Sequence, residues 1–302
     1  MRVSTSMIYD QLTQKMSANA ENMAKAQAAL STGVKYSRPS EAAGIVGRVQ
    51  ALEGRLKTLE ADVQAVAKVR TGVDAQSKAL QASAELMDRL KELAYEGAND
   101  PQPQSQLDSL AEEVNGLKRA LVDLANTRDA SDRYVFGGIN SGVPPYVIQP
   151  NGKVSYEGST TPLRVRVADV SYEDATVSGP SVWQGIERGG KTVSMFDILG
   201  NFEQALRENN LSNRTQGLRD VEELLTKVGT AIARTGGIQQ RLDIAMQQAD
   251  ETTVRAQQTL SDLKDLDYST ALSKLQQQEV LMQASQSLLA RMSKLTLLNQ
   301  MS

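Results

Sequence analysis

Apolar residues recur every seven positions over most of this chain, in rows that predict long helices. The longest row begins at Ile45 and continues without a break to Ala94, and a companion row starts at Val49. Two adjacent rows at this spacing form one apolar stripe, which favours coiled-coil-like packing. The pattern predicts a helix over 41–96, about 80 Å long at ~1.5 Å per residue. The members of the long row are Ile45, Leu52, Leu59, Val66, Val73, Leu80, Met87 and Ala94.

Shorter heptad rows predict the helices that accompany this long one. A helix is expected over 105–127, where Leu107, Val114 and Leu121 form a row. Its short connection to the preceding helix favours an antiparallel arrangement. Further helices are expected over 194–208 and from residue 215 onward, the second bending at Gly236–Gly237, because glycine weakens a helix interior.

Both ends of the chain carry the same pattern, which predicts helices over 6–30 and 267–298. An apolar stripe that continues almost to a chain terminus requires a partner. We therefore expect the two end helices to pair with each other and with other copies of the chain. The candidate assembly interface consists of Tyr9, Leu12, Met16, Met23, Leu30, Tyr268, Leu275, Leu281, Met282, Leu288, Leu289, Met292, Leu295 and Leu298.

The segment from Tyr134 to Gly190 differs from the rest because it is rich in glycine and proline. Short strands are expected over 134–136, 154–156, 163–167 and 175–177, separated by turns. In the third of these, apolar residues alternate with Arg164 and Arg166, so this strand should bury one face only. The composition predicts a small β domain inserted into a helical rod.

The predicted fold class is mainly α with a small inserted β domain. Its helices should form a long antiparallel coiled-coil-like rod with paired N- and C-terminal helices. The expected parts are an N-terminal axial core helix (1–40), rod helices (41–133), an outer β domain (134–190), a returning rod helix (191–266) and a C-terminal axial core helix (267–302).

Composition argues against most catalytic functions. The 302 residues include no cysteine and no histidine, which removes disulfides, Cys/His metal sites, thiol catalysis and the common general base. We expect no enzymatic activity and no cofactor. A net charge of −3 provides no basic surface for nucleic acid. No apolar run is long enough to span a bilayer, so no membrane insertion is expected.

One motif supports a different class of function. The segment 185–192 reads Gly-Ile-Glu-Arg-Gly-Gly-Lys-Thr, which matches the phosphate-binding loop of nucleotide-binding enzymes letter for letter. That loop requires a buried strand before it and a helix directly after it. The residues before this motif do not resemble a buried strand, and no helix is expected to start directly after it. A glycine-rich turn that leaves the β domain is the better interpretation. The acidic pairs Glu112–Glu113 and Glu222–Glu223 lie off the apolar rows, so we interpret them as solvated helix faces.

Several short segments, in this order and spacing, resemble the flagellin-like axial proteins of the bacterial flagellum. They include the opening Met-Arg-Val-Ser-Thr, the segment Leu-Ser-Thr-Gly at 30–33, Ser-Arg-Pro-Ser at 37–40, and Tyr-Val-Phe-Gly-Gly at 134–138. The segments 275–278 (Leu-Gln-Gln-Gln) and 295–298 (Leu-Thr-Leu-Leu) resemble the C-terminal helix of that family. Residues 41–44 depart from it, because the family usually carries paired aspartates there. The resemblance covers essentially the whole chain and is strongest to the group of hook-associated protein 3.

The resemblance implies a structural adaptor that joins the hook to the filament. Its implied partners are other copies of itself in a ring, hook-associated protein 1 on one side, and flagellin on the other. It also implies binding by a flagellar export chaperone before the protein is secreted through the flagellar type III channel, with the hook–filament junction of the bacterial flagellum as its final location. The alternative within this family is flagellin itself, the subunit of the filament.

Overall fold

The computed structural model describes residues 5–36, 43–99, 101–166, 172–188 and 190–300. Over these residues the chain is mainly helical with a few short strands, as predicted. Its internal contacts divide it into two compact units. Unit 1 comprises Met1–Thr58 and Thr252–Ser302, and unit 2 comprises Leu59–Glu251. Each unit is described by itself.

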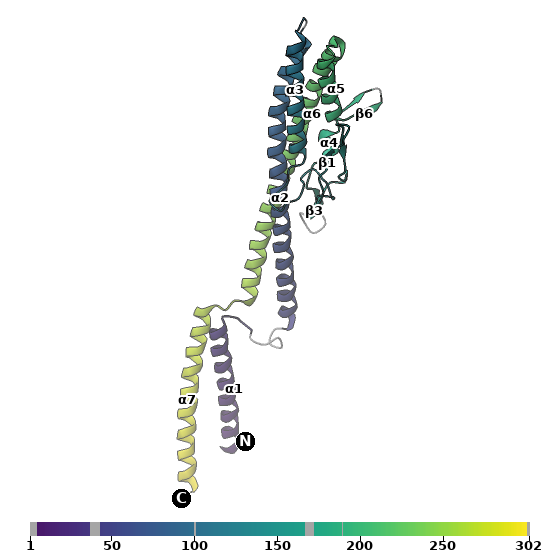
Figure 1. Cartoon of the computed structure of the whole chain (residues 1–302). Coiled ribbons are helices and arrows are strands. Elements are labelled where there is room, and N and C mark those ends of the chain that lie inside the picture. The colour runs from purple at the N-terminus through teal and green to yellow at the C-terminus, as the bar shows by residue number, and fades with distance from the viewer. Residues whose placement is uncertain (1–4, 37–42, 100, 167–171, 189, 301–302) are drawn as a thin grey trace. The chain divides into compact units, whose positions relative to one another are not determined.

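The long helices agree with the predicted ones to within a few residues, although residues 41 and 42 of the second lie outside the described part. A short helix at Gly179–Trp183 was not predicted. Gly236 and Gly237 do not interrupt the returning helix, which is continuous. The helices are α1 (Thr5–Thr32), α2 (Ala43–Ala98), α3 (Gln104–Ala125), α4 (Gly179–Trp183), α5 (Met195–Arg207), α6 (Leu211–Lys264) and α7 (Tyr268–Gln300) (Figure 1).

Unit 2 is built on the packing of α2, α3, α5 and α6 around one apolar core. The heptad row of α2 is buried here, since Val73, Leu80 and Met87 are inaccessible to solvent. Polar side chains join α2 to α6 beside this core: the Asp74 carboxylate accepts a 2.7 Å bond from the Gln239 amide. The rows in this unit therefore form an internal core, as their spacing predicts.

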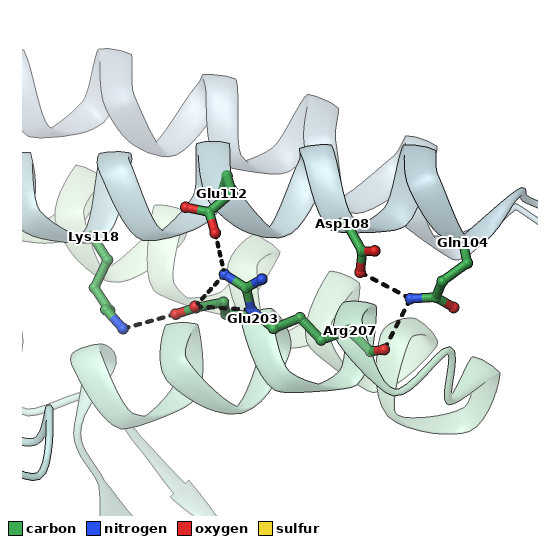
Figure 2. A network of polar contacts seen from close by, with 6 residues as sticks. All are labelled: Gln104, Asp108, Glu112, Lys118, Glu203 and Arg207. Atoms are coloured by element: carbon green, nitrogen blue, oxygen red, sulfur yellow. Dashed lines mark hydrogen bonds and ion pairs between the residues drawn. The ribbon is translucent and has the colours of Figure 1, made fainter.

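A polar network joins α3 to α5 on the surface of unit 2 (Figure 2). The Arg207 guanidinium donates to Glu112 at 2.7 Å and to Glu203 at 3.1 Å, and the Lys118 ammonium donates to the other oxygen of Glu203 at 3.0 Å. Lys118 and Glu203 are mostly shielded from solvent, so this pair is stronger than an ordinary surface ion pair. Glu112 therefore takes part in a contact between α3 and α5.

Two glycines let α5 approach its neighbours closely. A Cβ atom at Gly217 would lie 2.3 Å from a ring carbon of Phe202, and one at Gly97 would lie 2.7 Å from a methyl group of Leu206. Both distances are far shorter than a van der Waals contact. These positions therefore require glycine for packing reasons.

The glycine pair inside α6 has no such packing role. A Cβ atom at Gly236 would meet nothing within 4 Å, and one at Gly237 would meet only the end of Arg241 at 3.7 Å. Because glycine in a helix interior costs roughly 1 kcal/mol relative to alanine, changing both residues to alanine should stabilise unit 2 by about 1–2 kcal/mol. Thermal unfolding followed by circular dichroism tests this. Gly217→Ala in the same helix is the control and should destabilise; a destabilised Gly236→Ala/Gly237→Ala variant would contradict the expectation.

The strands of unit 2 form antiparallel hairpins. The strand β1 (Tyr146–Ile148) pairs with β2 (Val154–Tyr156), β3 (Arg164–Arg166) pairs with β4 (Tyr172–Asp174), and β5 (Ile186–Arg188) pairs with β6 (Lys191–Val193). The predicted strands at 154–156 and 163–167 are confirmed as β2 and β3. In β3 only Val165 is buried, which agrees with a strand that buries one face. Residue 167 lies outside the described residues.

The strands predicted at 134–136 and 175–177 are wrong. Neither segment forms a regular strand: Tyr134 makes only an isolated bridge with Arg128, and the Ala175 N–H donates to the Leu163 carbonyl at 2.6 Å, just beyond the β3–β4 pairing. A buried side chain satisfies other backbone groups of both segments. The buried Gln76 amide donates to the carbonyls of Val135 and Val177, at 3.1 and 2.8 Å, and its oxygen accepts the Val177 N–H at 3.0 Å. Gly138, with φ of +61°, turns the first segment away immediately afterwards.

Aromatic side chains connect the hairpins to the helices. The Trp183 ring stacks on Phe196 of α5 at 6.0 Å between centroids and meets the edge of Phe136 at 5.6 Å. These residues belong to the same apolar core as the helices. The hairpin region and the helical bundle therefore share one core in unit 2.

The phosphate-loop match is a β-hairpin. Gly185 has a φ of +82°, and residues 186–188 then pair with residues 191–193. No helix starts at the end of the motif, so its backbone N–H groups are not gathered at a helix N-terminus, which phosphate binding requires. The described residues of the motif therefore agree with the turn interpretation, and residue 189 lies outside them.

Candidate assembly interface

The helices α1 and α7 of unit 1 lie side by side and run in opposite directions (Figure 1). Apart from Ala29, their least exposed positions follow the same alternating spacing of four and three residues. This spacing is that of a coiled-coil seam, and we call the twelve residues that follow it the α1–α7 seam. On α1 they are Leu12, Met16, Asn19, Met23, Ala26 and Leu30. On α7 they are Ala271, Leu275, Gln278, Met282, Ser285 and Leu289.

The seam pairs large side chains with small ones at several levels. Matching the two series in antiparallel order sets Ala26 against Leu275, and Met16 against Ser285. Such alternation lets two helices interdigitate at close distance. The seam is nevertheless thin. Among the described side chains of α1 and α7, Ala271 alone is buried, at 8% exposure. The two helices by themselves therefore leave most of the seam side chains partly exposed to solvent.

The predicted interface residues divide into two groups. Seven of them lie in the seam: Leu12, Met16, Met23, Leu30, Leu275, Met282 and Leu289. Four others are exposed, with Tyr9 at 46%, Tyr268 at 57%, Leu281 at 48% and Leu288 at 52%. The side chains of Met292, Leu295 and Leu298 lie outside the described set. Leu275, Met282 and Leu289 therefore belong to the side of α7 that faces α1, whereas Leu281 and Leu288 are exposed to solvent.

Sequence reasoning missed the seam residues that are small or polar. Asn19, Ala271, Gln278 and Ser285 do not stand out as apolar positions, although they complete the spacing of four and three residues. That spacing is the signal that would have identified them. Gln278 is unusual, because its side-chain oxygen is buried without a hydrogen-bond partner.

A short joint connects the inner ends of the two helices. The chain leaves α1 through Gly33, whose φ of +72° suits glycine. Val34 then forms an antiparallel bridge with Asp265. The Leu266 N–H donates to the Gly33 carbonyl at 2.9 Å, and the Lys35 N–H donates to the Lys264 carbonyl at 2.8 Å. We call residues 33–35 and 264–266 the joint.

Asp267 caps the start of α7. Its carboxylate accepts the Thr270 hydroxyl at 2.7 Å and the backbone N–H groups of Ser269 and Thr270 at 3.0 and 3.2 Å. These bonds, led by that of the Thr270 hydroxyl, lower the pKa of Asp267 to about 2. The side chain therefore stays ionised and keeps its cap at all but strongly acidic pH.

The cap predicts a defined pH dependence. Because the folded pKa is depressed, the stabilisation is present above the ordinary carboxyl pKa and is lost as the pH falls through about 2. Asp267→Ala should therefore reduce helix content at pH 7, and the difference from wild type should vanish below about pH 2. Circular dichroism measured against pH tests this, with Asp262→Ala on an exposed face of α6 as the control. Equal helix content at pH 7 would contradict the assignment.

Two further findings concern membrane spans and metal ligands. No helix among the described residues is long and apolar enough to cross a membrane. Within the same residues, no group of three or more carboxylates, histidines or cysteines is placed to hold a metal ion.

Comparison with known families agrees with this architecture. The model of the bacterial flagellin N-terminal helical region matches residues 3–141, and that of the flagellin C-terminal helical region matches residues 218–301. Together they cover well over half of the chain and include both terminal helices. The chain belongs to the bacterial flagellin family. The resemblance noted in the sequence is thereby confirmed.

Named relatives within the flagellin family are structural proteins of the flagellum. The chain is 23% identical to flagellar hook-associated protein 3 of Escherichia coli, over 94% of this chain and 95% of that protein. It is 20% identical to flagellin of Bacillus subtilis, over 93% of this chain and 91% of that protein. The crystal structure of FlgL from Xanthomonas campestris matches 70% of this chain and 99% of its own, with a TM-score of 0.62 and 18% identity. This last likeness shows a common fold.

Proposed function

We propose that this flagellin-family protein is the structural adaptor that joins the flagellar hook to the filament. In this role it is not an enzyme. It assembles as a ring of copies and contacts hook-associated protein 1 on one side and flagellin on the other. An export chaperone holds it until it is secreted through the flagellar export channel. Its similarity to hook-associated protein 3 over nearly the full length of both chains supports this assignment.

The observation that carries the proposal is the exposed apolar row of α7. Leu281 and Leu288 are each about half exposed and lie one heptad apart, beside the side of the helix that faces α1. An α-helix in water places such residues against a partner, because each buried leucine contributes roughly 1.5–3 kcal/mol. Neighbouring copies in a ring supply that partner.

The thin seam suggests that assembly also completes the folding of the ends. Ordering the backbone of one residue costs roughly 1–2 kcal/mol. A side chain that is only half buried returns less than the roughly 1.5–3 kcal/mol of full burial. With about two seam residues per heptad, α1 and α7 do not offset that cost by themselves. Contacts with other copies therefore supply the remaining stability.

Limited proteolysis of the isolated protein tests this coupling. Cleavage should remove α1 and α7 first and leave a resistant fragment close to residues 43–264. In purified flagella the same sites should be protected, because assembly buries them. Equal resistance of α1, α7 and the unit 2 helices in the isolated protein would show that the pair is complete without neighbours.

The alternative function is that of the filament subunit, favoured by the similarity to flagellin of Bacillus subtilis over most of both chains. Immunogold labelling of intact flagella distinguishes the two roles. A single band at the boundary between hook and filament is the expected result. Labelling along the whole filament would replace the adaptor function with that of flagellin.

A further inference from the structure

The apolar residues of the α1–α7 seam do not determine its register. The Val34–Asp265 bridge and the antiparallel order of the two series together define one register, which we call the observed register. It sets Ala26 opposite Leu275 and Met16 opposite Ser285. A shift of one heptad sets Ala26 against Met282 and Met23 against Ser285, which preserves the match of large with small. The packing of the seam is therefore similar in both registers.

The polar residues in the seam do not select among these registers either. A buried polar side chain can fix the register of a coiled coil when it finds a partner in one alignment only. The buried oxygen of Gln278 has no hydrogen-bond partner in the observed register, where it faces Met23. Shifts of one heptad place it opposite Leu30 or Met16, and neither side chain is a donor. All three alignments leave Gln278 opposite an apolar side chain.

Asn19, the polar seam residue of α1, behaves in the same way. It opposes Met282 in the observed register, and shifts of one heptad place it opposite Leu289 or Leu275. Bringing Asn19 opposite Gln278 requires a shift of four residues, which would set Met23 against Lys274 and break the apolar stripe. The two amides therefore do not meet in any alignment that keeps the seam apolar, and they do not distinguish one heptad shift from another.

The joint, in contrast, has one alignment. The Val34–Asp265 bridge and its two flanking backbone hydrogen bonds pair specific residues of the two segments. The segment also requires a residue at position 33 with positive φ. Gly33 lies close to Tyr268, since a Cβ atom at this position would be 2.8 Å from the Tyr268 hydroxyl oxygen. A residue other than glycine would be strained there and would press against the start of α7.

We propose that the joint is a register lock that selects one alignment of the terminal helices. A slip of one heptad would move the exposed row of α7 by about 10 Å along α1, at ~1.5 Å per residue. The exposed residues of the two helices would then no longer form the same surface. This inference does not depend on the adaptor function, because it concerns the pairing of α1 with α7 within one chain.

Disulfide trapping in the full-length protein tests the lock, because the chain contains no cysteine of its own. The substitutions Ala26→Cys and Leu275→Cys report the observed register. Two further pairs report slips of one heptad in either direction: Ala26→Cys with Met282→Cys, and Asn19→Cys with Leu275→Cys. A disulfide requires Cβ atoms about 4 Å apart, so each pair reports one register. Oxidation traps paired α1 and α7 helices as a covalent product, even where the pairing is transient.

The three pairs are compared in the wild-type background and in two variants. Gly33→Val disrupts the joint, because a β-branched residue is a severe misfit at positive φ. Gly47→Val is the matched control, since it lies in the same unit on α2, with nothing within 4 Å of an added Cβ. The wild-type background and the control should form the disulfide of the observed register at least tenfold more readily than either slipped product. Gly33→Val should raise a slipped product at least tenfold.

Three outcomes would overturn the proposal. The first is an unchanged preference for the observed register in Gly33→Val. The second is loss of all three products in that variant, which would mean that the joint holds the helices together without choosing their alignment. The third is the absence of any preference in the wild-type background. Failure of the adaptor function would appear instead in the immunogold experiment and would leave these disulfide yields unchanged.

Discussion

Changing both Leu281 and Leu288 to aspartate should abolish incorporation of this protein into flagella while leaving the isolated protein as stable as the wild type. Both side chains are about half exposed, and neither lies in the α1–α7 seam. The substitutions therefore leave the residues of the α1–α7 seam unchanged. In an assembly they would bury two carboxylates in an apolar contact, which costs several kcal/mol for each charge that finds no partner.

The matched control carries the same charge change on another face of α7. Gln276 and Gln283 are exposed and are also one heptad apart, so Gln276→Asp/Gln283→Asp adds two negative charges with the same spacing. Motility and the recovery of each variant in purified flagella are the measurements, and thermal unfolding of the isolated proteins checks their stability. Normal incorporation of the leucine variant would show that this row is not an assembly contact. Failure of the control as well would point to net charge rather than to the apolar row.

Replacing Gln76 with leucine should have the largest effect on the stability of unit 2. This amide is fully buried and makes three hydrogen bonds to the backbone of Val135 and Val177. Leucine has a similar size but would leave one N–H group and two carbonyl oxygens buried without partners. At about 1–3 kcal/mol for each stranded group, the expected loss is roughly 4 kcal/mol, a large part of a typical folding free energy.

Thermal unfolding measures this loss, and Trp183 is a convenient local reporter because it is the chain's one tryptophan and lies in the aromatic cluster of unit 2. The melting temperature should fall by about 10 °C for a unit of this size. Gln81→Leu is the control, since Gln81 lies exposed on the same helix, and it should unfold like the wild type. A loss below about 1 kcal/mol for Gln76→Leu would show that the irregular segments hold their conformation without this amide.

The heptad rows by themselves determined the long helices of this protein. The row from Ile45 to Ala94 predicted α2, and the rows of the chain ends predicted α1 and α7, with boundaries a few residues from those observed. This succeeds because the period of the apolar positions reflects helix geometry directly, so it needs no knowledge of the partner. The absence of cysteine and histidine likewise excluded whole classes of chemistry.

Short strands were determined less well, because their conformation depends on residues far away in the sequence. The segments 134–136 and 175–177 have the composition of strands, yet their backbone groups bond to Gln76, which lies 59 residues before Val135 and 101 before Val177. The sequence of neither segment indicates that Gln76 is its hydrogen-bond partner. The apolar content of such a short run reports burial, and burial is compatible with an irregular backbone whenever a buried side chain supplies the hydrogen bonds.

The tertiary structure alone decided which apolar rows are core and which are surface. The rows of α2 and α7 look alike in the sequence, but Leu80 is fully buried in unit 2, whereas Leu281 and Leu288 remain about half exposed. It also identified Gly217 as a contact with Phe202. The reason is physical. A heptad pattern shows that one face of a helix must be covered, whereas the fold of the whole chain determines which elements cover it.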